Sequence, residues 1–304
     1  MIRIRISVAF LVLIHAAILA AGFLAPYPYD EHHREYPYQR PGTSVLGPPG
    51  EPYEVSFFTG GKLFHVKQPG YLFVLGTDSY GRDVLSRLLY GGRISLLTGL
   101  LATAISLSLG LILGTVAGFY GGWIDALVMR SSELLLALPW LYLLLGVRAA
   151  LPLHISPLQA FFLLIAILGS VGWIRPARIV RGVVLSARER GFVSAARGFG
   201  ASGFYLMRRH IMPLTAATII TQATILIPQY IVAEVTLSFL GLGVGEPVPS
   251  WGNMLSEARQ YYSLMEHGWM LAPGVLLVPV LFGYLSIGDY LKAPRDRSSF
   301  PVPK

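Results

Sequence analysis

The amino-acid sequence predicts an all-α integral membrane protein with six transmembrane helices, and three observations predict this class. Hydrophobic residues make up 54% of the 304 residues and charged residues only 13%, about half the charged share of an ordinary soluble domain. Six apolar stretches approach the roughly 20 residues that a helix needs to cross the hydrocarbon layer. Lys and Arg gather in alternate connections between these stretches, as the positive-inside rule describes for multi-pass proteins.

The predicted spans are separated by connections of unequal length. They lie at Ile6–Ala25, Ile94–Gly118, Ala126–Val147, Leu158–Ile174, Leu214–Glu234 and Trp269–Asp289. Residues 1–25 can also be interpreted as a cleaved signal peptide, because Arg3 and Arg5 precede an apolar stretch that ends in small residues. The apolar run is longer than the core of such a signal, which favours a retained first helix.

The distribution of Lys and Arg predicts the orientation of the chain. The connections on one side, together with both termini, hold 15 of the 24 Lys and Arg residues, whereas the short connections on the other side hold only Arg148 and Arg259. Short loops rich in Lys and Arg stay in the cytoplasm, so both termini are expected there. We assign the excess positive charge to contact with membrane lipid and not with nucleic acid.

Residues 26–93 differ in composition from the rest, because they are rich in Pro, Tyr and charge, and they are expected to fold on the exterior side. Glu54–Phe58 and Lys62–Val66 are β-prone runs that flank Thr59-Gly60-Gly61, a pattern typical of a hairpin. We therefore predict a small exterior β-hairpin subdomain between the first two helices. Residues 94–291 would form a five-helix core, and residues 292–304 a cytoplasmic tail.

Within this core, residues 175–213 are too polar to cross the membrane and too long for a simple connection, so we expect a folded cytoplasmic loop. Small residues allow close helix approach and glycines a sharp turn, and a proline suits the start of the following helix. This predicts a short helix, a turn and a second helix. The residues that support the interpretation are Ser194, Ala195, Ala196, Arg197, Gly198, Gly200, Ala201, His210 and Pro213.

This loop resembles a signature of the permease subunits of binding-protein-dependent ABC importers, in which Glu-Ala-Ala is followed by a glycine four residues later and then by a proline. Ser194 stands where that signature usually has glutamate. Two further stretches are similar to signatures of the dipeptide, oligopeptide and nickel branch: Leu75–Arg87, and Leu237–Gly243 with Pro249–Leu255. In the first of these we single out Gly76, Thr77, Asp78, Gly81, Arg82 and Asp83.

The resemblance implies the type I ABC importer permease fold in the inner (plasma) membrane. It implies as partners a homologous second permease, two cytoplasmic ATPase subunits that bind ATP and Mg, and an extracytoplasmic substrate-binding protein. It also implies a coupling helix near Phe192–Gly200 that docks into a groove of the ATPase. Ser194 can cap a helix but cannot supply the carboxylate of an ion pair at that interface.

The chain itself shows few signs of chemistry. It has no cysteine, and Gly60-Gly61-Lys62 lacks the remainder of a phosphate-binding loop, so we predict no catalytic residue, no metal and no cofactor in this chain. Glu234 is an ionisable residue inside an apolar segment with no basic residue within a helical turn. We expect Glu234 and Ser238 to line the translocation path or to contact a partner subunit.

The predicted function is a permease subunit that forms half of the path for dipeptides or oligopeptides. Import of nickel chelates or oligosaccharides by the same architecture stays open, because selectivity usually lies in the binding protein. An ion-coupled secondary transporter is disfavoured, since no cluster of carboxylates falls at the centre of the spans. An intramembrane enzyme is disfavoured because the spans lack a Ser/His/Asp grouping and a His-Glu-x-x-His motif.

Overall fold

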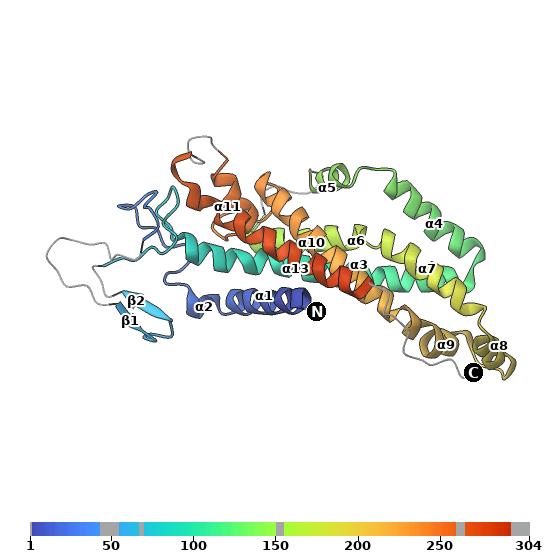
Figure 1. Cartoon of the computed structure of the whole chain (residues 1–304). Coiled ribbons are helices and arrows are strands. Elements are labelled where there is room, and N and C mark those ends of the chain that lie inside the picture. Colours follow the sequence, from blue (N-terminus) through green and yellow to red (C-terminus); the bar gives the residue numbers. More distant parts are fainter. Residues whose placement is uncertain (1, 43–54, 67–69, 150–154, 260–264, 293–304) are drawn as a thin grey trace.

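The structure is a computed structural model that describes residues 2–42, 55–66, 70–149, 155–259 and 265–292. It is an elongated bundle of helices, with α8 and α9 at one end and the hairpin β1–β2 and α11 at the other (Figure 1). We call these the α8 end and the α11 end. The predicted tail, residues 292–304, lies outside the described residues except for Lys292.

The long helix α3 (Val84–Tyr120) is the axis of the bundle. On one side α6 (Pro157–Val171) and α7 (Ile174–Arg188) pack along it, and on the other side α10 (Met212–Phe239) does so. The helix α13 (Ala272–Lys292) packs between α10 and α1 (Ile2–Leu19). These long helices place the functional segments at the two ends.

Glycines allow α7 to approach α3 closely. A Cβ atom on Gly114 would lie 2.4 Å from the backbone oxygen of Ala177. A Cβ atom on Gly110 or on Gly118 would also come too close to atoms of α7. Helices in membranes associate through such small residues, because lipid provides no hydrophobic driving force between them. As a result Val180 and Val184 are fully buried.

Five helices in the described part of the chain are long and apolar enough to cross a membrane. The predicted third span differs, because it is divided into α4 (Gly122–Leu136) and α5 (Trp140–Ala149). Pro139 lies in the break, and proline has no N–H for the helical ladder and clashes with the preceding turn. The predicted first span continues beyond α1 into the short helix α2 (Ala21–Leu24).

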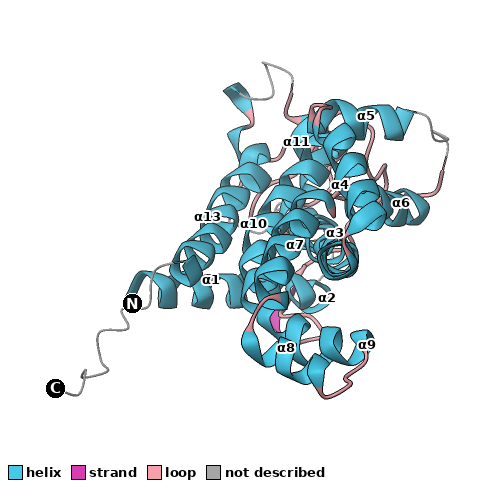
Figure 2. Ribbon diagram, turned by 90° about the vertical axis from the view of Figure 1, so that its right-hand side faces the viewer, coloured by secondary structure: helices cyan, strands magenta, loops and turns pink. Residues whose placement is uncertain are grey.

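The predicted cytoplasmic loop, residues 175–213, also differs from the structure. Its first part is not loop but helix α7, which continues the line of α6, and Arg181 of α7 forms an ion pair with Asp125 of α4. Then follow α8 (Gly191–Gly198), α9 (Gly203–Leu206) and the π-helix η1 (Met207–Ile211). Figure 2 shows α8 and α9 set apart below the bundle.

At the α11 end the strands β1 (Val55–Phe57) and β2 (Phe64–Val66) pair antiparallel, with Val55 opposite Val66. The hairpin is attached to α2, because the N–H of Leu63 donates to the carbonyl of Phe23 over 2.8 Å. The same end holds α11 (Trp251–Glu257) and the 3-10 helix η2 (Gly268–Leu271). Residues 43–54 and 67–69 of the predicted exterior subdomain lie outside the described residues.

Candidate functional site

The stretch before α3 folds into a tight turn that brings together the residues singled out in the sequence. Asp78 Oδ1 accepts hydrogen bonds from the backbone N–H groups of Tyr80 and Arg82. Gly81 has φ +73°, and a Cβ there would lie 2.0 Å from the carbonyl oxygen of His33. Only glycine is compatible with this conformation and this approach.

The flanks of the turn are fixed in the same way. Gly76 has φ +74°, and the buried Thr77 hydroxyl donates to the carbonyl of Tyr36 and accepts from the N–H of Gln39. Asp83 caps α3, since its carboxylate accepts from the N–H of Ser86 over 2.7 Å. Burial raises the pKa of Asp83 to about 7, although the hydrogen bonds from Ser86 oppose the shift.

A charge cluster lies on this turn, and we define it as Asp78, Arg82, Arg87, Glu246 and Glu257. It is largely buried except at Glu246, whose side chain is 47% exposed. Arg82 donates to Asp78 (2.7 Å), Glu246 (2.6 Å) and Glu257 (2.9 Å). Arg87 donates from Nη2 to both glutamates over 3.0 Å. The side chain of Arg82 is 4% exposed and that of Arg87 is 1% exposed. The cluster therefore ties the start of α3 to α11 and to the segment after α10.

The charge cluster contains three carboxylates and two guanidinium groups, so it holds one excess negative charge when all are ionised. The pKa of Glu257 is raised to about 7, because the effect of burial, together with the charges of Asp78 and Glu246, outweighs the lowering by Arg87 and Arg82. Burial alone would also raise the pKa of Glu246, but its hydrogen bond to Arg87 and the two guanidinium charges lower it. Glu257 therefore gains its proton as the pH falls through neutrality, well above the range of an ordinary glutamate.

Sequence reasoning found Asp78 and Arg82 but missed Arg87, Glu246 and Glu257. The available signal was complementary charge. Two acidic residues, Glu246 and Glu257, flank the segment Pro249–Leu255, and two basic residues, Arg82 and Arg87, lie just before and just inside the start of α3. Nothing in the sequence indicates which acid meets which base, since Arg82 and Glu246 are 164 residues apart.

Glu234 and Ser238 lie inside the bundle near the charge cluster. Both are buried, and the Ser238 hydroxyl donates to Glu234 Oε1 over 2.6 Å. The helix α11 touches α10 here, because a Cβ on Gly252 would lie 2.4 Å from the carbonyl oxygen of Val235. In this structure neither side chain reaches the surface of the chain, and a role in the path stays a prediction.

At the α8 end, the glycine of the predicted turn terminates α8. Gly200 has φ +82°, its N–H donates to the carbonyl of Arg197, and the N–H of Ala201 donates to that of Ala196. These two bonds form the Schellman motif, whose left-handed residue is usually glycine. Open space surrounds Gly200 within this chain, and its role in docking to an ATPase subunit stays a prediction.

The helix α8 is attached to the bundle through Val193 and the partly buried Ala196, and it presents most of its other residues to solvent. Val193 is 1% exposed and packs on α7 and α9, whereas Ser194, Ala195 and Gly198 are exposed. Ser194 lies inside α8, whose N-cap is Arg190, so the expectation that Ser194 caps the helix is wrong. The side chain that caps a helix here is Ser202, at the start of α9.

The exposed face at the α8 end is aromatic and basic. Phe192 and Phe199 are 45% and 93% exposed, and the His210 ring lies 6.0 Å from that of Phe192. Arg197 lies over the ring of Phe119. The remaining predicted residue, Pro213, occupies the first turn of α10. Such an apolar and basic face suits a protein partner, since large exposed apolar residues mark interaction sites.

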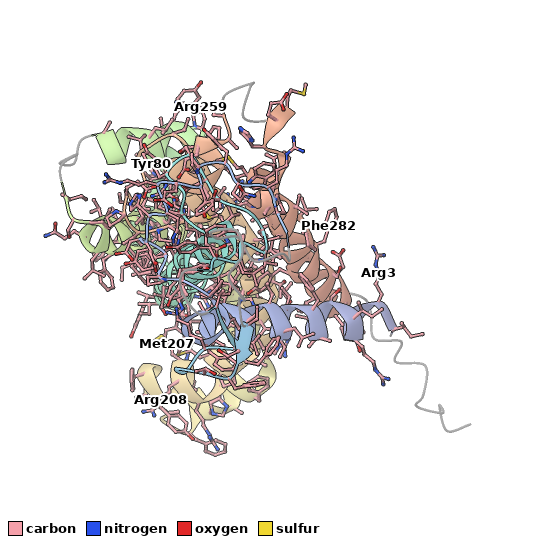
Figure 3. The ribbon with its side chains drawn as sticks, turned by 90° about the vertical axis from the view of Figure 1, so that its left-hand side faces the viewer. Arg3, Tyr80, Met207, Arg208, Arg259 and Phe282 are labelled. Carbon is pink, nitrogen blue, oxygen red and sulfur yellow. The ribbon has the colours of Figure 1, made fainter. Side chains whose placement is uncertain are left out.

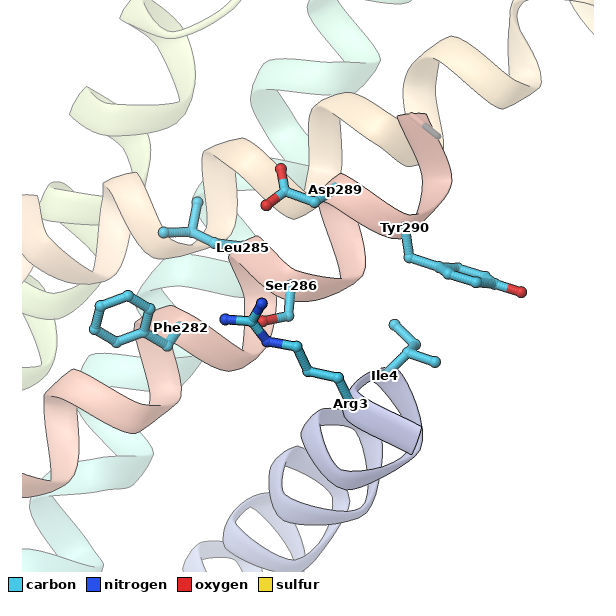
Figure 4. Close-up of a pocket in the computed structure, with 7 residues that line it drawn as sticks. All are labelled: Arg3, Ile4, Phe282, Leu285, Ser286, Asp289 and Tyr290. Carbon is cyan, nitrogen blue, oxygen red and sulfur yellow. The ribbon is translucent and has the colours of Figure 1, made fainter. Parts of the chain in front are cut away.

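Among the described residues, no group of three His, Asp or Glu side chains is placed to hold a metal ion. A cavity of about 340 Å³ lies between the start of α1 and the end of α13, where Arg3 extends from α1 toward α13 (Figure 4). Its walls include both Arg3 and Asp289, so it does not favour a ligand of either charge.

Comparison with known proteins shows which family the chain belongs to. The model of the family described as "Binding-protein-dependent transport system inner membrane component" matches residues 110–294. The chain is 38% identical over 222 residues to the dipeptide transport system permease protein DppC of Alkalihalophilus pseudofirmus, covering 73% of this chain and 70% of that protein. It is 39% identical to the protein of the same name from Bacillus subtilis, covering 73% and 67%.

Proposed function

Because the chain belongs to the family of binding-protein-dependent transport system inner membrane components, we propose that it is a permease subunit of an ABC importer for peptides. It is a multi-pass membrane protein, with five helices long and apolar enough to span among its described residues. The observation that carries the substrate class is the similarity to two dipeptide permeases over about three quarters of the chain.

In this proposal the α8 end faces the cytoplasm and the α11 end faces the exterior. The positive-inside rule supports this orientation, because the segment from Arg188 to Arg209 at the α8 end carries five arginines. Both termini would then be cytoplasmic. The charge cluster would lie on the exterior side, where the substrate-binding protein delivers its cargo.

The chain would couple to two ATPase subunits through α8 and would itself catalyse no reaction. ATP and Mg would be bound by those subunits, since this sequence has no phosphate-binding loop. The face of Phe192 and Phe199 provides an apolar contact in place of the ion pair that Ser194 cannot form. A homologous second permease would form the other half of the path.

The test is uptake by the assembled importer in proteoliposomes. Labelled peptides, nickel chelates and oligosaccharides are supplied with the binding protein and with ATP, and only peptides should accumulate. In Gly200→Glu we expect peptide uptake to be lost, because a glutamate at φ +82° disrupts the end of α8. Gly182→Glu, an exposed position on α7 with open space around it, is the matched control.

Peptide uptake by Gly200→Glu at the wild-type rate would contradict the coupling assignment. Accumulation of nickel or oligosaccharide but not of peptide would contradict the substrate class. ATP hydrolysis by the chain purified free of other subunits would contradict the assignment of all catalysis to the partners.

A further inference from the structure

A continuous groove runs along one face of α10. It consists of three adjoining cavities of about 270, 440 and 410 Å³. The first and second share Trp140 and Gln229 in their walls, and the second and third share Thr236. We call this surface the α10 groove. Its other walls come from α4, α5, α6 and α7 in the first cavity, from α5 and α13 in the second, and from α11 with its C-terminal flank and η2 in the third.

The groove follows a helical stripe from the middle of α10 to its end at the α11 end of the bundle. The residues that line it recur at intervals of three or four: Ile225, Gln229, Val232, Thr236 and Phe239. From Gln229 to Phe239 the helix rises about 15 Å at 1.5 Å per residue. An extended peptide covers this distance with four or five residues, at about 3.3–3.6 Å each.

The charges of the groove all have one sign. Among the described residues that line it, the groups that carry a charge at neutral pH are Arg175 at one end and Arg259 at the other, and none is a carboxylate. Neither guanidinium forms an ion pair with an acidic residue in the described parts of the chain. Figure 3 looks from the α11 end and labels Arg259 at the upper edge of the molecule.

The polar groups in the middle of the groove are Gln229 and Thr236. Gln229 is partly exposed, and its side chain makes no hydrogen bond among the described residues. A primary amide offers both donors and an acceptor, which suits a peptide backbone. A lipid acyl chain in the same place would leave these groups without partners, which is costly away from water.

We infer that the α10 groove is the part of the path that contacts the substrate, and that Arg259 binds the C-terminal carboxylate of a short peptide at the exterior mouth. A guanidinium matches a carboxylate through two parallel hydrogen bonds. Gln229 would contact the peptide backbone farther along. This inference rests on the proposed function, and it adds a preference for peptides with a free carboxyl end.

The experiment compares two substrates in the complete importer in proteoliposomes. One is a labelled apolar tetrapeptide with a free C-terminal carboxylate, and the other is the same peptide as its C-terminal amide. The acid-to-amide uptake ratio is measured for the wild type, for Arg259→Gln and for the control Arg34→Gln, an exposed arginine outside the groove. Any preference of the binding protein cancels, because the same binding protein serves all three.

In Arg259→Gln we expect the acid-to-amide ratio to fall roughly tenfold, the loss expected for one charged hydrogen-bonded pair. Arg259→Lys should recover part of the lost preference for the acid, and Arg34→Gln should leave the acid-to-amide ratio unchanged. An unchanged ratio in Arg259→Gln overturns the inference. If peptide uptake persists and is still abolished by Gly200→Glu, that result leaves the proposed function standing.

A second measurement does not depend on the arginine variants. A photo-crosslinking amino acid replaces Val232, which is 41% exposed in the groove, and the labelled tetrapeptide is added during turnover. Crosslinking to the peptide, reduced by excess unlabelled peptide, is expected. Crosslinking only to lipid or only to the partner permease would overturn the inference, because those occupants would then fill the groove.

Discussion

Replacing Glu257 by Gln should stabilise the protein at alkaline pH and leave its stability at acid pH nearly unchanged. Glu257 is the carboxylate that carries the excess negative charge of the charge cluster. Its side chain is 16% exposed, and burial raises its pKa to about 7 from the ordinary value of 4.5. It faces Arg87 from the first turn of α3, Arg82 and Asp78 from the preceding turn and Glu246 from the segment after α10.

The sign follows from proton binding. The folded protein keeps a proton on Glu257 that the unfolded chain releases, so this carboxyl contributes full stability below pH 4.5 and loses it as the pH rises to about 7. A difference of about 2.5 pKa units corresponds to about 3 kcal/mol at pH 8. Glutamine resembles the protonated form and does not ionise, so the variant avoids this loss.

The assay is thermal unfolding of the detergent-solubilised importer at pH 5 and pH 8. We expect Glu257→Gln and the wild type to unfold at similar temperatures at pH 5. At pH 8 the unfolding temperature of the variant should exceed that of the wild type by on the order of 5 °C. The control is Glu266→Gln, because Glu266 is an exposed acid at the α11 end. Its unfolding temperature should match that of the wild type at both pH values. A variant less stable than the wild type at pH 8 would refute the reasoning.

Three other substitutions test the local geometry. Gly81→Ala should destabilise the turn before α3 by several kcal/mol, because its Cβ would meet the backbone of His33; limited proteolysis of the exterior segment would detect this, and wild-type resistance would contradict it. Ser202→Ala should cost about 1 kcal/mol as a lost N-cap, whereas Ser194→Ala should be neutral in thermal unfolding. Gly114→Val should prevent α7 from packing on α3, so a correctly assembled, fully active variant would disprove the close contact.

The positions of the long helices and of the α8 turn could be predicted because their signals are local. Apolar runs of about 20 residues, and a glycine after a short helix, each report on a few neighbouring residues. The division of the third span also had a local signal, Pro139. The prediction gave hydrophobicity more weight than the proline, and that choice was wrong.

The helix α7 was misassigned because its arginines were counted without its partner. Arg175, Arg178 and Arg181 make the start of residues 175–213 polar, yet the residues between them include Ala177 and Val180, which are fully buried. The signal lay elsewhere in the chain, in the glycines that recur every four residues along α3. That spacing indicates a face prepared for a close helix, but it does not identify which helix packs there.

The arginines show most clearly why the sites could not be derived from the sequence alone. Arg82 and Arg259 both lie beside apolar segments at the α11 end, and in the sequence they look alike. In the structure Arg82 is buried with three carboxylates, whereas Arg259 is exposed at the rim of a groove without any. A buried guanidinium must be paired within the chain, because its desolvation is costly. An exposed one beside an apolar groove is free to pair with a ligand, and only the fold separates these two cases.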